Sequence, residues 1–514
     1  MKSPVTFSRV ALPCGLVAIG LLSGCSTYTT QSSDFRTAWK AGQLAEASAE
    51  VDKKAEKNAN NQSTVVWSLE QGAVYRARAL ENLPPVAPTN TTAMALGPAG
   101  AAPGDAYDVE MTKKSIESFN WASDRIITYD DQAKAKVASE AGAILTNQAN
   151  TSYRGRASDR IMLETYQALN YLKLGEPDNA RVALNKVLQH QRDAVDANSK
   201  RIEEAQAKAA EAKEGKVADE QGKTASYDAE KAMQDEGVAN ALKEIDTDLE
   251  TDVRPYEVYV NPFAVFVDGL FFMTRGEDAS DMEHARKSIE RVAAMAPESS
   301  FIKEDLALAE GLAYGKKPEG LTYVIFETGS APYLDQIQIP IPLFLVTDKV
   351  QYTQCALPIL KRVPDFVPAA SIAIEGQTLD TQLLCSMDSV IAREFKNEWV
   401  AVLTKSIISA GVKGLIQYEI NRQLKDQGGT AQLIGMLATS IYTATTTIAD
   451  TRSWTTLPKQ FQYARFQTPK DRTITIAAGS APQTIVIEPG KVNLVYVKSI
   501  APGLPSLISQ TVLK

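Results

Sequence analysis

The spacing of apolar residues changes near residue 319, and this change constrains the fold more than any other feature of the chain. Upstream, apolar side chains recur at helical intervals, as in "TYQALNYLKLGEPDNARVALNKVL". Downstream, short runs such as "LTYVIFETG", "SIAIEG", "RTITIAAG" and "QTIVIEPGKVNLVYV" are rich in β-forming residues and are bounded by Gly or Pro. The sequence therefore predicts an α+β protein, with a helical part over 34–318 and a β-rich part over 319–514.

A helical insertion is predicted within the β-rich part, at about 386–449. Its first segment contains "VIAREFKNEWVAVLTKSIISAGVKGLIQYEINRQLKD" and is apolar enough for a long, largely buried helix. Its second segment, "TAQLIGMLATSIYTATTTIA" at 430–449, has no charged residue, and its length approaches the roughly 20 residues that a membrane span needs. Because Thr, Ser and Gln are scattered through it, we expect a helix that covers the sheet, with membrane contact as the alternative.

Helical hairpins repeat in the N-terminal part. In residues 165–188, Gly175 separates two helical stretches that carry the small residues Ala168 and Ala180 on their apolar faces. This spacing resembles a tetratricopeptide repeat, in which two antiparallel helices pack closely. The stretches "FRTAWKAGQLAEASAEV" and "NPFAVFVDGLFFMTRGEDASDMEHARKSIERVAAMAP" show related spacing, the latter with a longer turn. The alternative is a run of ordinary helical hairpins, which has the same packing physics.

Two segments interrupt these helices. Residues 83–106 are rich in Pro, Ala and Gly without any period, which predicts a mobile inserted loop. Residues 191–250 are dominated by Ala, Glu, Lys and Asp, which predicts a charged helical extension. That extension is interpreted either as a solvated spacer or as an arm that binds a partner.

The N-terminus carries the signature of an exported lipoprotein. Lys2 and Arg9 precede an apolar stretch of signal-peptide length, so residues 1–24 are predicted to be a signal peptide. The sequence Leu22-Ser23-Gly24-Cys25 resembles the lipobox of bacterial lipoproteins, in which the cysteine is acylated and becomes the first residue. Several acyl chains on Cys25 would anchor the protein firmly to a membrane, with 25–33 as a polar tether. The alternative is a conventional signal peptide with an incidental cysteine.

The residue after the cysteine and the overall charge narrow the location and the partners. The residue after Cys25 is Ser26, whereas an Asp there would resemble an inner-membrane retention signal. This favours a location on the periplasmic face of the outer membrane of a Gram-negative bacterium. The net charge of −8 argues against nucleic acid as a partner. Cys355 and Cys385 are the two cysteines beyond residue 25. In an oxidising compartment they are a disulfide candidate, with two free buried thiols as the alternative.

Catalytic motifs are not found in the sequence. The chain has two histidines, His190 and His284, in separate hairpins, where surface or packing roles are expected. Neither CxxC nor HExxH occurs, so we predict no metal site and no cofactor. No Gly-x-Ser-x-Gly stretch indicates a hydrolase. The sequence therefore predicts a protein that is not an enzyme.

One polar cluster in the β-rich part stands out, in "ADTRSWTTLPKQF". Asp450 and Arg452 are two residues apart on an extended segment, so they point the same way and are expected to form a charge-assisted pair. Trp454 lies on the same side and is expected to stack on the guanidinium. The cluster is interpreted as structural bracing, or alternatively as a platform that faces a ligand such as a glycan.

Three longer stretches carry a family resemblance: "YRGRASDRIMLETYQALNYLKLGEPDNARVALNK", "NPFAVFVDGLFF" and "ADTRSWTTLPKQFQYARF". Through them the chain is similar to a poorly characterised family of bacterial lipoproteins that have tetratricopeptide-like N-terminal helices and a β-rich C-terminal part. The insertion at 83–106 departs from the family pattern. Genes of this family often neighbour one for an outer-membrane lipoprotein that activates peptidoglycan synthases. The resemblance implies an association with cell-wall assembly.

These observations favour a lipid-anchored scaffold of the cell envelope. Its helical repeats are expected to bind envelope proteins, with the peptidoglycan-synthesis machinery among the candidates. The alternative is an envelope enzyme or a glycan-binding protein that acts on peptidoglycan. An enzyme would need a cleft with convergent polar groups of perturbed pKa, whereas a scaffold would present broad grooves.

Overall fold

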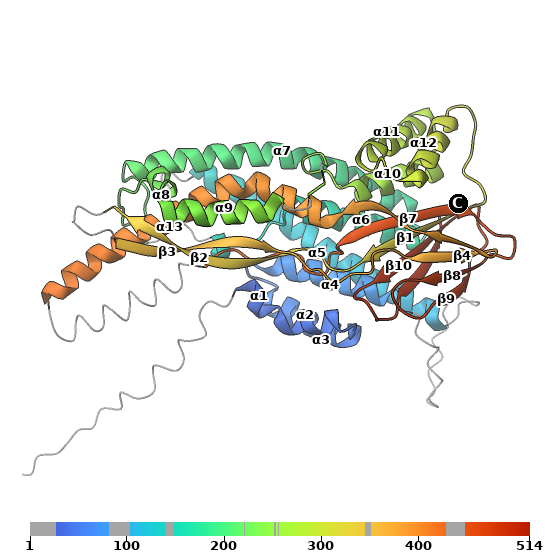
Figure 1. Ribbon diagram of the computed structural model, residues 1–514, viewed down its shortest axis with the longest axis horizontal. Helices are drawn as coiled ribbons and strands as arrows, with labels where there is room; N and C mark the ends of the chain where they lie inside the picture. Colours follow the sequence, from blue (N-terminus) through green and yellow to red (C-terminus); the bar gives the residue numbers. More distant parts are fainter. Residues whose placement is uncertain are drawn as a thin grey trace, which may run out of the picture.

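The computed structural model describes residues 27–81, 103–139, 148–219, 221–250, 253–254, 256–344, 351–427 and 448–514 (Figure 1). Helices come first along these residues and strands follow, which confirms the predicted α+β class. The predicted signal peptide and Cys25, most of the 83–106 insertion, and almost all of 430–449 lie outside the described residues.

The helical elements are α1 (Tyr28–Gln31), α2 (Ser33–Lys40), α3 (Leu44–Asn58), α4 (Thr64–Arg78), α5 (Pro103–Ser139), a short 3-10 helix (Gln148–Asn150), α6 (Ala157–Lys173), α7 (Pro177–Lys213), α8 (Ala229–Met233), α9 (Glu236–Glu250), α10 (Pro262–Arg275), α11 (Ala279–Met295), α12 (Ser300–Leu312) and α13 (Met387–Gln427). The strands are β1 (Leu321–Thr328), β2 (Tyr333–Leu343), β3 (Gln351–Lys361), β4 (Ser371–Ile374), β5 (Gln377–Asp380), β6 (Gln382–Ser386), β7 (Gln460–Gln467), β8 (Thr473–Ala477), β9 (Gln483–Val486), β10 (Val492–Ser499) and β11 (Leu507–Val512).

Helical hairpins α2–α3, α6–α7 and α10–α11 occupy the three positions at which the small-residue spacing predicted them. Gly42 and Gly175 lie between the paired helices of the first two hairpins, with φ of +70° and +74°. Glycine adopts this left-handed conformation without the steric cost of a Cβ atom. Ala168 and Ala180 are fully buried, which allows the backbones of α6 and α7 to approach closely.

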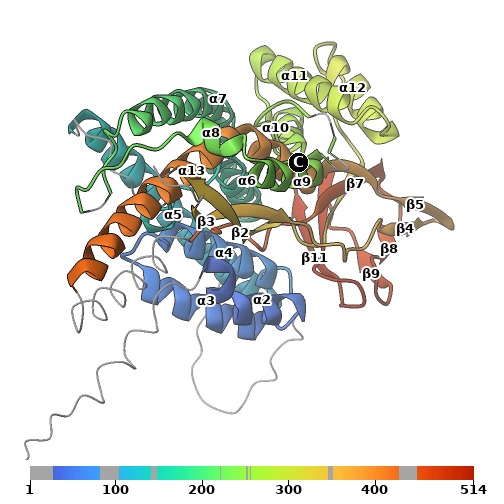
Figure 2. The ribbon, with the colours of Figure 1, turned by 60° about the vertical axis from the view of Figure 1, so that its left-hand side comes forward.

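A five-stranded sheet has the order β11-β10-β1-β7-β6. In the view of Figure 2 it lies beneath α10–α12. Strands β1 and β10 are parallel, and the other neighbours are antiparallel. On one face, Tyr323 of β1 donates a hydrogen bond to Asp305 of α12. On the other face, Thr328 of β1 bonds the backbone at Val367, beside the small sheet β5-β4-β8-β9. The five-stranded sheet is therefore covered on both faces, which explains why every residue of β1 and β10 is buried.

A continuous hydrophobic core, here called the main core, joins the helical and β-rich parts. It includes side chains from α1–α7, α10–α12 and both sheets, and it also takes in the first turn of α13. Trp67 of α4, Phe266 of α10 and Val495 of β10 are all fully buried within it. The change from helix to strand near residue 319 therefore does not divide the main core.

A second core lies in an elongated arm, at the left of Figure 1. The arm consists of the distal half of α7, α8, α9, the antiparallel ribbon β2–β3, and most of α13. The predicted charged extension at 191–250 thus packs its apolar side against strands and a helix from the C-terminal part. Ala212, Val238 and Ile245 are among its buried contributions.

Helix α13 is the central helix of the arm. The stretch Met387–Gln423 is long and apolar enough to cross a membrane by length and composition, with a mean hydropathy of 1.4 over its most apolar window. However, 61% of that window is buried inside the protein. Most of that window therefore packs against other parts of the protein. Residues 428–447, the rest of the predicted helical insertion, lie outside the described part of the chain.

Prolines protect the edges of the ribbon. Residues that face each other across the ribbon alternate between hydrogen-bonded and non-hydrogen-bonded pairs. Pro340 and Pro342 of β2 belong to the same one of these two kinds of pair, and so does Pro358 of β3, because it faces Gln336. A proline has no N–H to give to a ladder, so these pairs must be the ones whose backbone groups point outward. The ribbon therefore lacks donors along its free edges at these positions, which disfavours pairing with another chain.

The segment predicted as a polar tether, 25–33, is folded from residue 28 onward. Tyr28 is 6% exposed, and its hydroxyl donates a hydrogen bond of 3.1 Å to Glu70. Thr29 bonds the backbone of Leu334 at 2.7 Å. The hydroxyl-rich composition suggested a solvated segment, but those hydroxyls have internal partners, so the prediction of a tether is wrong for residues 28–33.

The two cysteines do not form the predicted disulfide. Cys355 on β3 is buried in the core of the arm, whereas Cys385 on β6 is buried in the main core, and both thiols are free. A disulfide requires Cα atoms within about 7 Å of each other, and these two cysteines, each buried in a different core, form none. The alternative of two buried thiols is correct, and burial raises the pKa of each to about 12.

Candidate functional site at the boundary of the two cores

The predicted pair of Asp450 and Arg452 forms just before β7. Arg452 donates from Nε to Asp450 Oδ1 at 2.8 Å and from Nη2 to Oδ2 at 2.6 Å. The same guanidinium donates to the backbone oxygens of Gln62 and Thr151, at 3.0 Å and 2.8 Å. Arg452 is 4% exposed. It therefore braces the C-terminal segment against two loops of the helical part.

Trp454 does not stack on Arg452, and that part of the prediction is wrong. The guanidinium lies 5.2 Å from the ring centre of Tyr153 instead. Trp454 packs edge-on against Phe119 and Tyr166, with centroid distances of 5.6 Å and 5.9 Å. With an exposed fraction of 1%, it offers no face to a ligand, so the contacts favour structural bracing over a ligand-facing platform.

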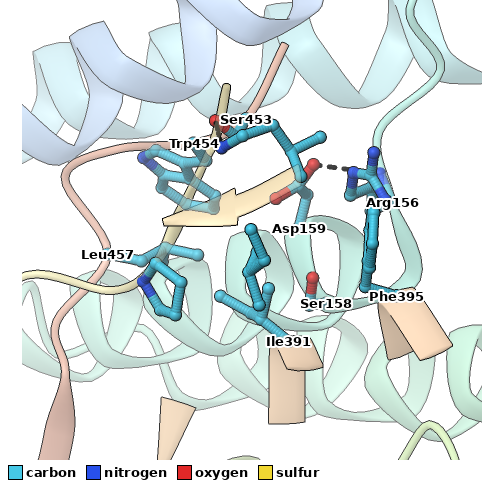
Figure 3. Close-up of a pocket in the computed structure, with 11 residues that line it drawn as sticks. Arg156, Ser158, Asp159, Ile391, Phe395, Ser453, Trp454 and Leu457 are labelled. Carbon is cyan, nitrogen blue, oxygen red and sulfur yellow. Dashed lines mark hydrogen bonds between the residues drawn. The ribbon is translucent and has the colours of Figure 1, made fainter. Parts of the chain in front are cut away.

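A small cavity lies beside Trp454, between α6, α13, the ribbon and the segment before β7 (Figure 3). Its lining residues are Arg156, Ser158, Asp159, Pro332, Leu334, Leu360, Ile391, Phe395, Ser453, Trp454 and Leu457. The space open to the centre of a water molecule is about 20 Å³. That volume holds about one water molecule, which is far too little for a substrate.

A carboxylate from α13 caps the start of α6 at the edge of this cavity. Glu394 Oε1 accepts hydrogen bonds from the backbone N–H groups of Ala157, at 2.7 Å, and Ser158, at 3.3 Å. Its Oε2 accepts from the same Ser158 N–H at 3.2 Å. Such N–H groups have no partner within their own helix, and the helix dipole also favours a negative group there. Glu394 therefore links α13 to α6 across 237 residues of sequence.

The pKa of Glu394 is raised from 4.5 to about 7. Burial is the main cause, and the neighbouring carboxylate of Glu398, one helical turn away, raises the pKa further. Arg156 and the hydrogen bond from Ser158 lower it, but by less. Glu394 is 2% exposed. A buried carboxyl with this pKa exchanges its proton near neutral pH.

Glu398 forms ion pairs with arginines from two other helical segments. Its Oε2 lies 3.2 Å from Arg156 Nη1, at the N-cap of α6, and its Oε1 contacts Arg201 of α7. Next to Arg156, Asp159 accepts the backbone N–H of Arg156 at 2.9 Å and the hydroxyl of Tyr153 at 2.5 Å. We call Arg156, Asp159, Arg201, Glu394 and Glu398 the charged joint.

Tyr259 adds strain beside the charged joint. Its φ is +59°, a left-handed conformation that is uncommon for a bulky residue and is concentrated at functional sites. The tyrosine is 7% exposed, and its hydroxyl is buried without a hydrogen-bond partner. Burial is the main cause that raises the pKa of Tyr259, and the negative charges of Glu398 and Glu394 raise it further. The strained residue thus faces the same two carboxylates.

Sequence reasoning missed the charged joint. The available signal was the pair Glu394 and Glu398, four residues apart on a helix that the sequence predicts to be largely buried. Carboxylates on a buried helix need partners. Their partners lie in α6 and α7, about 200 residues or more upstream. No local pattern identifies them.

The two histidines lie apart from the charged joint. His284 Nε2 lies 2.7 Å from the buried Asp268 Oδ2, which also accepts the hydroxyl of Ser288 at 2.6 Å. The bond to Asp268 raises the pKa of His284. His190 is partly buried, and burial, with the nearby Arg160, lowers its pKa to about 4. Among the described residues, no group of three or more His, Cys, Asp or Glu side chains could hold a metal ion.

Other buried charges also tie the helices to the C-terminal part. Glu70 of α4 accepts the backbone N–H groups of Thr455 and Thr456, at 2.6 Å and 3.1 Å, and both of their hydroxyls, at 2.7 Å and 2.6 Å. Glu327 of β1 is paired with Lys498 of β10 and is 2% exposed. Both carboxylates therefore bind other parts of the fold.

Comparisons with known proteins find no relative: no family model, no curated protein and no solved structure matches this chain. The charged joint can bind and release a proton near neutral pH, and it holds α6, α7 and α13 together. Its cavity has room for a water molecule but not for a substrate.

Proposed function

We propose that the protein is a lipid-anchored scaffold of the cell envelope that binds partner proteins through its helical hairpins. One observation carries the proposal. The buried ionisable groups around the described cavity are used to hold elements of the fold together, and the cavity holds about one water molecule. Ligand and substrate pockets are typically several hundred Å³ in volume.

The outer surface of the helices supports the proposal. Helices α5 and α7 each have 37 residues, which at about 1.5 Å per residue gives rods of about 55 Å. Trp121 on α5 is 43% exposed, and Val182 and Val195 on α7 are 55% and 49% exposed. Tetratricopeptide-like hairpins of this kind, stacked side by side, offer extended surfaces to a partner.

The anchor in this proposal is the lipid on Cys25, which holds the protein on the periplasmic face of the outer membrane of a Gram-negative bacterium. The lipobox-like sequence and Ser26 support that location. The partners are envelope proteins, and the peptidoglycan-synthesis machinery is the first set to test. Mass spectrometry of the N-terminal peptide tests the anchor. Acylated Cys25 is expected, and an unmodified peptide that begins elsewhere would contradict it.

Site-specific cross-linking tests the scaffold. A photo-reactive amino acid is placed at Trp121, Val182 or Val195 in cells, and the adducts are identified by mass spectrometry. Val486 on β9 is the matched control, because its 57% exposure equals that of Val182 within two percentage points. We expect the helical positions to give a defined set of envelope proteins that the Val486 position does not give. The set should weaken when Cys25→Ser releases the protein from the membrane.

Three results would overturn the scaffold. Helical positions that give no adducts, or the same adducts as Val486, while the protein stays membrane-bound would show that the helices are not a partner surface. Release of products from purified peptidoglycan by the Cys25→Ser protein would instead identify an envelope enzyme. Saturable binding of the Cys25→Ser protein to peptidoglycan fragments, without release of products, would identify a glycan-binding protein.

A further inference from the structure

The charged joint lies where the two cores meet. Met387 and Val390, at the start of α13, belong to the main core, whereas Phe395 and Trp399 belong to the core of the arm. Glu394 and Glu398 lie at and just beyond this crossing. Helix α7 crosses the same boundary, because Leu184 lies in the main core and Ala212 in that of the arm.

Arg201 lies on α7 between those two buried residues, and it pairs with Glu398. Charged side chains of both helices therefore lie at the boundary between the cores. Apolar contacts are insensitive to pH, but buried ionisable groups are not. The charged joint lies at this boundary, so a proton bound or released there can act on both cores.

We propose that the charged joint is a proton-sensitive coupling, closed when Glu394 is protonated and loosened when Glu394 ionises, so that pH sets how tightly the arm is held to the main core. The closed form buries Glu394 against the N-terminus of α6. Ionisation places a second negative charge beside Glu398 in a site closed to solvent, where such a charge is costly. An opened joint, in which water reaches Glu394, removes this cost.

The groups that face Glu394 come from every element packed around it. On α13 the group is Glu398, at the start of α6 they are Arg156 and Asp159, on α7 it is Arg201, and before α10 it is Tyr259. Arg156 and Arg201 are already paired with Glu398. They therefore neutralise Glu398 first, and Glu394 is left with the backbone N–H groups of α6 as its hydrogen-bond donors.

The expected size follows from proton linkage. With Glu394 at a pKa of about 7 when closed and near 4.5 when hydrated, the opening constant rises up to tenfold per pH unit between these values. Between pH 5.5 and 7.5 this amounts to a rise of about 20-fold, followed by a plateau. The inference concerns the fold itself and is independent of the anchor and of the partners in the proposed function.

Hydrogen exchange of the Cys25→Ser protein measures this opening. Peptides that cover 153–163 and 387–400 are followed by mass spectrometry at pH 5.5, 6.5 and 7.5, with rates corrected for the intrinsic effect of pH. We expect protection at the start of α6 to fall about 20-fold over this range. Glu394→Gln, which is neutral at every pH, should remove the pH dependence. Glu419→Gln is the matched control, because Glu419 lies on the same helix and pairs with Arg422 on its surface.

A second variant keeps the inference testable if Glu394→Gln fails to fold. Glu398→Gln removes the negative neighbour, so the fall in protection should move to lower pH. Constant protection of the Cys25→Ser protein, with Glu394 and Glu398 in place, between pH 5.5 and 7.5 would overturn the proposal. A fall that persists in Glu394→Gln, or one that Glu398→Gln leaves at the same pH, would do the same.

Discussion

Substitution of Glu70 by Ala should destabilise the protein strongly, because Glu70 joins three separate parts of the chain. From α4 it accepts hydrogen bonds from Tyr28 of α1 and from both the backbone and the hydroxyls of Thr455 and Thr456. The carboxylate is fully buried. Alanine leaves two backbone N–H groups and three hydroxyls without their acceptor.

The magnitude follows from these contacts. A hydrogen bond to a charged acceptor contributes about 1.5–3 kcal/mol, and an unsatisfied buried donor costs about 1–3 kcal/mol. The sum is not additive, since the hydroxyls can turn to other acceptors and burial of the ionised carboxylate is itself unfavourable, as its raised pKa shows. Removal of one member of a buried charged network typically costs about 3–5 kcal/mol. We expect a loss of about 4 kcal/mol for Glu70→Ala and a smaller loss for Glu70→Gln, which keeps one acceptor.

Urea unfolding of the Cys25→Ser protein, followed by tryptophan fluorescence, measures this loss. Trp67 reports on the region, because its ring centre lies 5.0 Å from that of Tyr28. The matched control is Glu46→Ala, at an exposed position of α3, which should change the free energy of unfolding by less than about 0.5 kcal/mol. A loss below about 1 kcal/mol for Glu70→Ala would refute the view that this carboxylate joins the helical and β-rich parts.

Three further predictions concern other buried groups. Burial raises the pKa of Asp305 from 3.8 to about 6, so its protonation stabilises the fold at low pH and this contribution is lost as pH rises from about 4 to 6; Asp305→Asn should flatten the pH dependence of the urea midpoint in that window, and an unchanged slope would contradict the assignment. Cys355 and Cys385 should react with a thiol reagent at pH 8 only after denaturation, because both thiols are buried and burial raises their pKa to about 12. A Cys355–Cys385 disulfide seen in non-reducing mass spectra would contradict this expectation. Gly411→Ala should loosen the arm by about 2 kcal/mol or more, because its new Cβ would lie 2.2 Å from the ring of Tyr227; normal exchange protection across α8 would show that the ring yields.

The sequence predicts those features that depend on local pattern. Helical hairpins such as α6–α7 follow from apolar spacing and from a glycine at the turn, both of which lie within one short stretch. The change from helix to strand near residue 319 is visible for the same reason. The pairing of Asp450 with Arg452 was also predictable, because residues two apart on an extended segment share a side.

Contacts between distant segments account for what the sequence did not predict. Trp454 meets Phe119 and Tyr166, which no spacing near residue 454 reveals. The cysteine pair suggested a disulfide because the compartment would allow one, but the geometric condition depends on which core each strand enters. Glu394 was overlooked for a similar reason, since its donors at the start of α6 are 237 residues upstream.

The burial of Tyr28 determines how far the protein can act from a bilayer. If Cys25 carries the lipid, only three residue steps separate the acylated residue from a side chain fixed in the main core, and a chain of that length spans at most about 10 Å. The anchor would then hold the folded protein close to the bilayer instead of acting as a long flexible tether. Any reach toward a distant partner must come from the rigid length of the molecule itself, and the long helices α7 and α13, which run through the arm, supply that length.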